Sequence, residues 1–500
     1  MMNDVLRKSY SVNWIVYSVI LILSALFIYF FSRGTSPFYN FYGHDSAIFI
    51  MMGQAFLEGK VPYTDFFDHK GPMLIFINAL GQLLVKGREG IFLLQIFNLS
   101  IVLWSIYKIF RLFSTSVIKA GIVIFTFLLF FRFTITEGNL TEEYTLPFIF
   151  LSIYVAFRFY FKKKILGLPD AALLAICFFV PFWMRANNVG IICACVIFIV
   201  YILFNRKQYK SLLKFAGGFF LIFCILSGIL SAYFLYKGAF SEMIYSSFLF
   251  NLKYARIPDL ILPKYARYYT IFIIAAVSFL CLGSITYYKK NRDKNIFIFA
   301  LLSVLFGILP LLLTGVDRLL LHYMTLTIPL SVVGLIFFLG FVPKGRFNNK
   351  IGLCIIVLLV ILLIFSLRFR YYKVKNMDDD YIVAVKELCQ NIPENERNYV
   401  FAYHTSPSFY LVSGMPVTFK YFILQEFHAR VDTTIYTDIN KMVTESKPLW
   451  IVTEIKSLKR FRNKKLRSVI EQDYYLVDQK NYNENEPLFL YRLKDTPIKK

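Results

Sequence analysis

The sequence predicts an α-helical protein that crosses a membrane many times and carries a small α/β domain at its C-terminal end. Hydrophobic residues make up 57% of the 500 residues and charged residues only 17%, whereas soluble domains carry roughly a quarter charged residues. Apolar runs near the length of about 20 residues that crosses a bilayer recur along most of the chain. Beyond residue 370 charges of both signs return and the apolar runs become short. This pattern excludes a soluble enzyme and a secreted disulfide scaffold.

The membrane-spanning elements follow from the apolar runs. We expect about eleven helices, at 14–31, 91–110, 117–133, 144–161, 168–184, 188–204, 213–236, 268–288, 295–314, 323–341 and 351–368. The basic clusters between these runs all face the cytoplasm if the N-terminus does, as the positive-inside rule requires. The apolar stretch 72–85 is interpreted as an interfacial helix, because one more span there would move the basic run 162–164 to the outside.

The first apolar stretch, 14–31, is longer than the apolar core of a signal peptide and lacks a small-x-small cleavage site, so we expect an uncleaved helix. With the N-terminus in the cytoplasm, the outer loops are 32–90, 134–143, 237–267 and 315–322. We therefore expect a membrane module at 1–369, including the long first outer loop, and an extracytoplasmic domain at 370–500. The short loops and free cysteines favour a bacterial plasma membrane.

The C-terminal domain alternates short strands and helices. Strands are expected at 399–403, 449–453 and 488–491. Helices are expected at 432–446 and through Cys389, where Asp378–Asp380 can cap the helix start. The basic run 459–467 is interpreted as a solvated helical face, with the outer leaflet or an anionic wall polymer as the alternative.

The formal charge of +24 arises from 55 Lys and Arg against 31 Asp and Glu. Most of this excess lies in short loops between apolar runs, so membrane orientation explains it and nucleic acid is not an expected partner. Most cysteines lie inside apolar runs without a CxxC pair, which excludes a disulfide framework. His404 and His428 lack the spacing of metal ligands and are interpreted as structural.

The densest group of ionisable residues lies in the first outer loop. Gly43-His44-Asp45-Ser46 is followed by the segment Tyr63-Thr64-Asp65-Phe66-Phe67-Asp68-His69-Lys70-Gly71-Pro72. A carboxylate near apolar surface can act as a general base, and lysine and histidine suit an anionic phosphate. An ordinary solvated loop is the alternative. The flanking aromatic residues and the direct continuation into the interfacial helix favour a functional site.

This order of residues resembles the polyprenyl-phosphate-sugar-dependent glycosyltransferases of the GT-C fold. More narrowly, it is similar to the family 39-like group, which includes protein mannosyltransferases and the aminoarabinose transferases of lipid A. The resemblance covers the whole chain in layout and is best supported at 43–72. It implies a GT-C-like membrane module, a polyprenyl-phosphate-linked sugar as donor, and inversion at the anomeric carbon.

The resemblance also implies roles for individual residues. Asp45 matches the carboxylate that activates the acceptor nucleophile, and Lys70 matches a lysine that meets the lipid-linked phosphate. Asp68 and His69, with Asp65 nearby, lie where relatives carry acidic residues around the donor or a divalent metal ion, and whether a metal is bound stays open. Ser46 follows Asp45 where protein mannosyltransferases carry Asp-Glu, which weakens the case for a protein acceptor.

Further candidates lie at span ends on the outer face. Glu142 and Glu143 match a second acidic motif, with solvated interface residues as the alternative. Arg185 can bind phosphate bidentately, or mark a turn from which its side chain reaches water. Arg318, His322 and Tyr323 resemble the family's basic residue followed by His-Tyr before a span. The alternative is that His322 is an ordinary histidine at the membrane interface.

The sequence thus predicts an integral-membrane enzyme that moves a sugar from a polyprenyl-phosphate carrier, drawn from the membrane lipids, to an envelope glycan, lipid or protein at the outer face. Asp45 is the predicted general base. Lys70, Arg185, Arg318 and His322 are the predicted phosphate ligands. A transporter or flippase of a lipid-linked sugar is the alternative, but the sequence shows neither repeated halves nor paired broken helices.

Overall fold

The computed structural model describes residues 2–255, 266–313, 320–341, 348–374, 378–455, 460–483 and 486–494. The chain forms two compact units. The first, called here the membrane unit, comprises Met1–Ser32, Phe92–Ala232 and Pro258–Tyr372. The second, called the loop–tail unit, comprises Arg33–Ile91, Tyr233–Ile257 and Lys373–Lys500.

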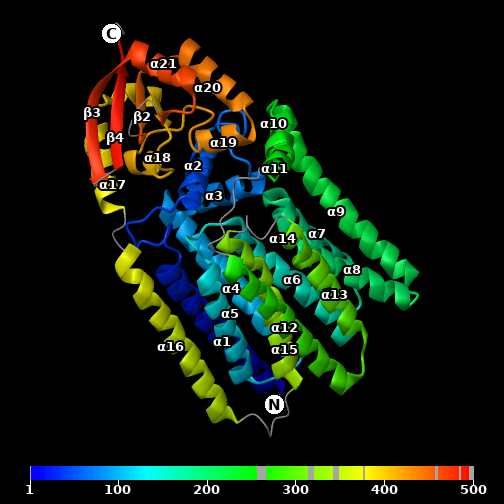
Figure 1. Cartoon of the computed structure of the whole chain (residues 1–500). Helices are drawn as coiled ribbons and strands as arrows, with labels where there is room; N and C mark the ends of the chain where they lie inside the picture. Colours follow the sequence, from blue (N-terminus) through cyan, green and yellow to red (C-terminus); the bar gives the residue numbers. More distant parts are fainter. Residues whose placement is uncertain are drawn as a thin grey trace. The chain divides into compact units, whose positions relative to one another are not determined.

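The membrane unit is helical throughout its described residues (Figure 1). Its elements are α1 (Met2–Phe31), α4 (Arg88–Arg111), α5 (Val117–Thr134), α6 (Thr141–Lys162), α7 (Leu168–Met184), η1 (Ala186–Val189), α8 (Gly190–Asn205), α9 (Tyr209–Tyr236), α12 (Ala266–Asn291), α13 (Asn295–Gly307), α14 (Leu309–Leu313), η5 (Leu321–Thr327), α15 (Ile328–Phe341) and α16 (Asn349–Val374). The boundary with the other unit falls inside α4, α9 and α16.

Among the described residues, nine helices are long and apolar enough to cross a membrane. They coincide with nine of the expected spans, and the expected spans 168–184 and 295–314 are occupied by the shorter α7 and by α13 with α14. Large apolar side chains such as Leu221 on α9 and Ile361 on α16 are more than half exposed. Such surface belongs against lipid tails, so the predicted multi-pass helical fold class is confirmed, while the number of crossings stays a prediction.

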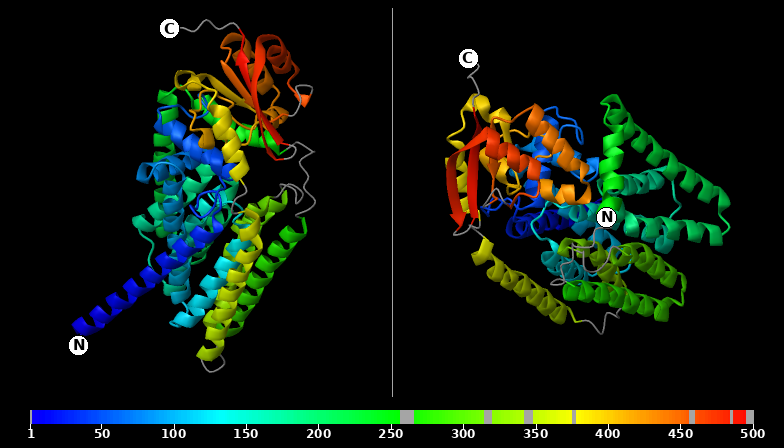
Figure 2. Two further views of the ribbon diagram at one scale, coloured as in Figure 1. Left: turned by 90° about the vertical axis from the view of Figure 1, so that its left-hand side faces the viewer. Right: turned by 45° about the horizontal axis from the view of Figure 1, so that its top comes forward.

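The core of the membrane unit depends on close helix packing. α12 and α15 make the most extensive helix pair and run side by side in Figures 1 and 2. A Cβ atom on Gly283 would lie 2.2 Å from the carbonyl oxygen of Gly334, and one on Gly334 would lie 2.1 Å from that of Phe279. Small residues allow such backbone contact, which is how helices associate where lipid supplies no hydrophobic driving force.

The loop–tail unit combines the first outer loop with the C-terminal region. Its elements are α2 (Asp45–Leu57), α3 (Pro72–Leu84), α10 (Phe240–Ile244), η2 (Tyr245–Leu249), α11 (Phe250–Tyr254), α17 (Asp379–Cys389), η7 (Glu394–Tyr399), β1 (Val400–Tyr403), α18 (Phe409–Ser413), α19 (Gln425–Val431), α20 (Thr434–Glu445), β2 (Trp450–Thr453), α21 (Lys464–Asp473), β3 (Tyr474–Asn483) and β4 (Glu486–Leu493).

The sheet of this unit has the order β1-β2-β4-β3, with β1 and β2 parallel and the other pairs antiparallel (Figure 1). β1, β2 and β4 lie where the apolar runs predicted strands. β3 was not predicted, because its sequence mixes Asp478, Lys480 and asparagines with its apolar positions, and such residues are depleted in strands. It is an edge strand, where polar residues are tolerated.

The first outer loop is more regular than the sequence suggested. α3 begins with Pro72 at its first turn and confirms the helix expected at 72–85, whereas α2 was not expected. Phe67 packs in one core with Phe250 and Phe401, and its backbone N–H donates to the carbonyl of Lys420 at 2.8 Å. This loop is therefore part of the same folded body as the C-terminal sheet.

Two local predictions in the C-terminal region were wrong. Asp378 does not cap α17 with its side chain; its carboxylate instead accepts a hydrogen bond from the backbone N–H of Tyr42 at 3.2 Å. Over its described residues, 460–467, the basic run is not one helix, because α21 begins only at Lys464, where the side chain of Asn463 accepts from the N–H of Leu466. A capping asparagine competes with helical backbone and so marks a helix start.

Candidate active site

The segment between α2 and α3 holds its charged residues in a fixed backbone. Tyr63 adopts a φ of 71°, in the left-handed region that few bulky residues occupy. From there its hydroxyl donates to the carbonyl of Lys70 at 2.8 Å. The side-chain amide of Asn251 donates to the carbonyl of His69, also at 2.8 Å. These two bonds hold the backbone carbonyls of His69 and Lys70 in place.

The side chains of this turn form a compact charged cluster. Nζ of Lys70 lies 2.9 Å from Nε2 of His69 and 3.8 Å from Oδ1 of Asp68, whose same oxygen accepts from the Lys70 backbone N–H at 2.8 Å. The side chain of Asp68 is 2% exposed and that of Lys70 14%. Burial raises the pKa of Asp68, and the charge of Lys70 only partly offsets this rise. The turn thus presents an ammonium group in a poorly hydrated setting.

Asp45 belongs to the same cluster. It lies in the first turn of α2, its side chain is 30% exposed, and its carboxylate is 3.3 Å from Nδ1 of His44. Its charge contributes to raising the pKa of Asp68, so the two carboxylates interact electrostatically. Asp65 has a different role, because its carboxylate accepts from the backbone N–H of Val61 at 2.7 Å and closes an exposed turn.

His428, on α19, joins this cluster although the sequence gave no reason to expect it. Its ring lies 6.0 Å from the ring of His69 and is fully buried among Phe67 and Phe250. Burial and then the charge of Lys70 lower the pKa of His428 to about 3. Neither ring nitrogen makes a well-formed hydrogen bond to a described residue. No spacing signal could reveal a neutral histidine that comes from so distant a part of the chain.

The cluster offers the ligand atoms of a small metal site. One atom each from Asp68, His69 and His428 lie within 4.8 Å of one another, and nitrogen with carboxylate oxygen is a donor set that zinc accepts. The ammonium of Lys70, however, already lies against both His69 and Asp68. A divalent ion would have to displace it. The arrangement therefore fits the chain's own cation better than a metal ion.

A second cluster lies inside the membrane unit. Glu142, in the first turn of α6, is 1% exposed and accepts from Nη1 of Arg185 at 2.8 Å. Nη2 of Arg185 donates to the hydroxyl of Tyr323 at 2.9 Å, and the guanidinium lies over the same ring. His322 contacts the Tyr323 ring edge-on. The buried carboxylate thus orients a partly exposed guanidinium.

Glu143 extends this cluster toward α4. Its carboxylate accepts from the amide of Gln95 at 3.0 Å, and the amide of Asn98 donates to its backbone carbonyl at the same distance. The hydroxyl of Ser32 in turn donates to Gln95. Sequence reasoning missed Gln95, although a polar side chain within an apolar run was a usable signal.

The sequence candidates therefore separate into two groups. The loop–tail unit brings together Asp45, Asp68, His69 and Lys70 but leaves Asp65 apart. The membrane unit brings together Glu142, Glu143, Arg185, His322 and Tyr323. Arg318 lies outside the described residues.

Comparison with solved structures gives an informative likeness. No family model matches the chain, and no curated protein matches its sequence. Among solved structures, the chain resembles ArnT from Cupriavidus metallidurans, in a crystal structure bound to undecaprenyl phosphate. The likeness has a TM-score of 0.53 at 10% identity and covers 95% of this chain and 98% of that one. The chain therefore has the GT-C fold of that protein, as the motif at 43–72 predicted.

Proposed function

We propose that this protein is an integral-membrane glycosyltransferase. It moves a sugar from a polyprenyl-phosphate carrier to an acceptor at the outer face of the membrane. The observation that carries the proposal is the buried Asp68–His69–Lys70 turn beside Asp45, which pairs a fixed cation with a more exposed carboxylate. The shared fold supports it, since ArnT was crystallised with undecaprenyl phosphate. Transfer of a sugar with phosphate as the leaving group needs a cation to stabilise the phosphate and a base to deprotonate the acceptor.

Lys70 is the proposed ligand of the donor phosphate. Its ammonium is held by His69 and Asp68, and it also lies 5.6 Å from the ring of Phe49. In such a poorly hydrated site a fixed positive charge stabilises a developing anion more strongly than in water. Because the pKa of His428 is lowered, this neighbouring histidine stays neutral, and the charge of Lys70 remains available to the phosphate.

Arg185 is the proposed second phosphate ligand, with Arg318 and His322 as further candidates. Glu142 and Tyr323 hold its guanidinium in one orientation, and its side chain remains 22% exposed. A planar guanidinium suits phosphate oxygens, and pre-orientation reduces the entropy lost on binding.

Asp45 is the proposed general base. Its carboxylate accepts the proton of an acceptor hydroxyl while that oxygen bonds to the anomeric carbon. The bond from this carbon to the phosphate oxygen breaks, and its electron pair leaves with the polyprenyl phosphate. Attack from the face opposite the phosphate inverts the anomeric configuration. The partial exposure of Asp45 allows an acceptor to reach it.

The test uses the purified full chain in lipid nanodiscs, a panel of radiolabelled polyprenyl-phosphate sugars and a crude envelope fraction as acceptor. Asp45→Asn and Lys70→Met should each lower transfer by about 100-fold or more. Matched controls are Asp65→Asn, which keeps its turn, and Lys86→Met at an exposed lysine of the same loop.

Equal transfer by Asp45→Asn and wild type would refute the role of Asp45. If no donor is consumed while reconstituted vesicles translocate a lipid-linked sugar, the protein is a transporter and the enzymatic proposal fails.

A further inference from the structure

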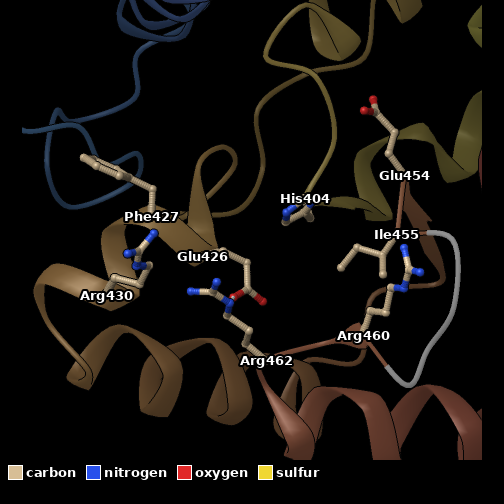
Figure 3. Close-up of a pocket in the computed structure, with 8 residues that line it drawn as sticks. All are labelled: His404, Glu426, Phe427, Arg430, Glu454, Ile455, Arg460 and Arg462. Atoms are coloured by element: carbon tan, nitrogen blue, oxygen red, sulfur yellow. Dashed lines mark ion pairs between the residues drawn. The ribbon is translucent and has the colours of Figure 1, made fainter. Parts of the chain in front are cut away.

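The C-terminal region contains a cavity of about 480 Å³ that belongs to neither cluster described above. Figure 3 shows it between α19 and the segment that follows β2. Three arginines and a histidine dominate its wall. The lining residues are His404, Glu426, Phe427, Arg430, Glu454, Ile455, Arg460 and Arg462. A volume in this range suits a small ligand or a short polymer segment.

The two carboxylates of the cavity are bound by tyrosines rather than by arginines alone. Glu426 accepts from the hydroxyls of Tyr403 at 2.5 Å and Tyr436 at 2.7 Å, and it lies 4.0 Å from Nε of Arg462. In Figure 3 the carboxylate of Glu454 is directed away from the arginines.

The positive charge of the cavity is therefore incompletely balanced. Glu454 accepts from the hydroxyl of Tyr381 and from the backbone N–H of Ser406 at 2.6 Å. Arg430 and Arg460 form no ion pair with any described residue and are exposed. Of the three arginines, only Arg462 is paired with a carboxylate among the described residues, and guanidinium groups left without a carboxylate at a cavity favour an oxyanion ligand.

The wall of the cavity is fixed before any ligand binds. His404 adopts a φ of 54°, and its backbone N–H donates to the side chain of Gln425 at 3.1 Å. The amide of the buried Gln425 donates to the carbonyls of Ala402 and Tyr421, both at 2.8 Å. These bonds hold the end of β1 against the start of α19 and keep His404 at the cavity wall.

Helix α19 connects this cavity with the Lys70 cluster. Glu426 and Arg430 on this helix line the cavity, whereas His428 lies beside His69. The ring of Phe427 lies 5.5 Å from the ring of Tyr254 and 6.2 Å from that of His69. A chain bound along α19 would therefore extend from the arginines toward the proposed reaction centre.

We infer that this cavity binds the acceptor, and that the acceptor is an acidic glycan bearing phosphate or carboxylate groups. The arginines bind its oxyanions, and Glu426 accepts hydrogen bonds from its hydroxyls. A lipid headgroup would use the cations but not the half-buried carboxylate of Glu426. Naming the ligand as acceptor rests on the proposed function, whereas binding itself does not.

Binding is measured on the full chain in zwitterionic nanodiscs. The probes are oligogalacturonate, a glycerol-phosphate oligomer, a neutral dextran oligomer and inorganic phosphate. The acidic oligomers should bind more tightly than dextran, and Arg430→Gln and Arg462→Gln should each weaken their binding about tenfold, since each loses charge-assisted hydrogen bonds. The control is Arg467→Gln on α21, where the arginine pairs with Glu471 outside the cavity.

Several outcomes overturn the inference. Equal affinity for dextran, or the same loss in Arg467→Gln, would show that the cavity does not recognise acidic glycan. Inorganic phosphate binding as tightly as the oligomers would show a small-anion site. Vesicles with anionic lipid that outcompete the oligomers would show a membrane-contact surface.

The failure of this inference is distinguishable from failure of the proposed function. Asp45→Asn should abolish transfer yet leave oligomer binding unchanged. If the acidic oligomers bind but no sugar is transferred, the binding site stands and the enzymatic proposal fails. If transfer proceeds unchanged in Arg430→Gln and Arg462→Gln, the cavity does not hold the acceptor.

Discussion

The ion pair between Glu142 and Arg185 gives a quantitative prediction for the membrane unit. Glu142 is 1% exposed and its partner 22%, and the two atoms that bond are 2.8 Å apart. Replacing Arg185 with Met leaves a buried carboxylate without its cation, and breaking such a pair costs about 3–5 kcal/mol. Because the guanidinium is partly solvated, we expect the lower end of this range, about 3 kcal/mol.

The double substitution tests the cause of this loss. Glu142→Gln alone should cost about 1–2 kcal/mol, because Arg185 keeps its bond to Tyr323 and some water. The double variant should lose only about 2 kcal/mol of the free energy of unfolding, since it leaves neither charge without a partner. The coupling free energy between the two substitutions is then about 2–3 kcal/mol.

The free energy of unfolding can be followed in mixed micelles by tryptophan fluorescence, since Trp183 lies two residues before Arg185 on the same helix end. The exposed pair Lys447–Asp473 is the control, for which a coupling of about 1 kcal/mol or less is expected. Additive costs at Glu142 and Arg185 would refute the reasoning, and so would a cost below about 1 kcal/mol for Arg185→Met.

Three further predictions concern other sites. Burial raises the pKa of Asp432, but hydrogen bonds from Lys253, Tyr245 and Thr434 outweigh it and hold this pKa below its ordinary 3.8. Asp432→Asn should therefore destabilise the fold by about 1–2 kcal/mol at pH 7, and thermal unfolding should show this difference shrinking as the pH falls below about 4. Because Lys70 occupies the cation position, EDTA should leave sugar transfer unchanged, and loss of activity that zinc restores would contradict this. Gly334→Leu should lower the melting temperature and the yield of folded protein, whereas Gly228→Leu, with open space around it, should change neither.

Much of the fold could be predicted because a long apolar run that crosses a bilayer forms a helix. A backbone without water must satisfy its own hydrogen bonds, so each such run becomes a helix, and basic residues then orient the loops. Helix α2 escaped prediction because 45–57 is too short for a span and its apolar residues are buried by tertiary packing, not by a helical stripe.

The site was predictable only where its residues are neighbours in sequence. Asp68, His69 and Lys70 form one turn, so their proximity follows from the chain itself. The bond between Glu142 and Arg185 depends on how α6 meets the end of α7, and the approach of His428 to His69 depends on the C-terminal sheet. Such long-range contacts require packing that local patterns do not encode.

The joint core of the first outer loop and the C-terminal region has a consequence for biogenesis. Phe67 and His69 meet Lys420 and His428, residues that the ribosome adds some 350 positions later. At about 5–20 residues per second, the loop waits roughly 20–70 s after its synthesis for its partners. The Lys70 turn therefore acquires its surroundings only when the C-terminal region has been synthesised and has folded. A nascent or truncated chain could insert its helices in full and still lack the complete surroundings of Lys70.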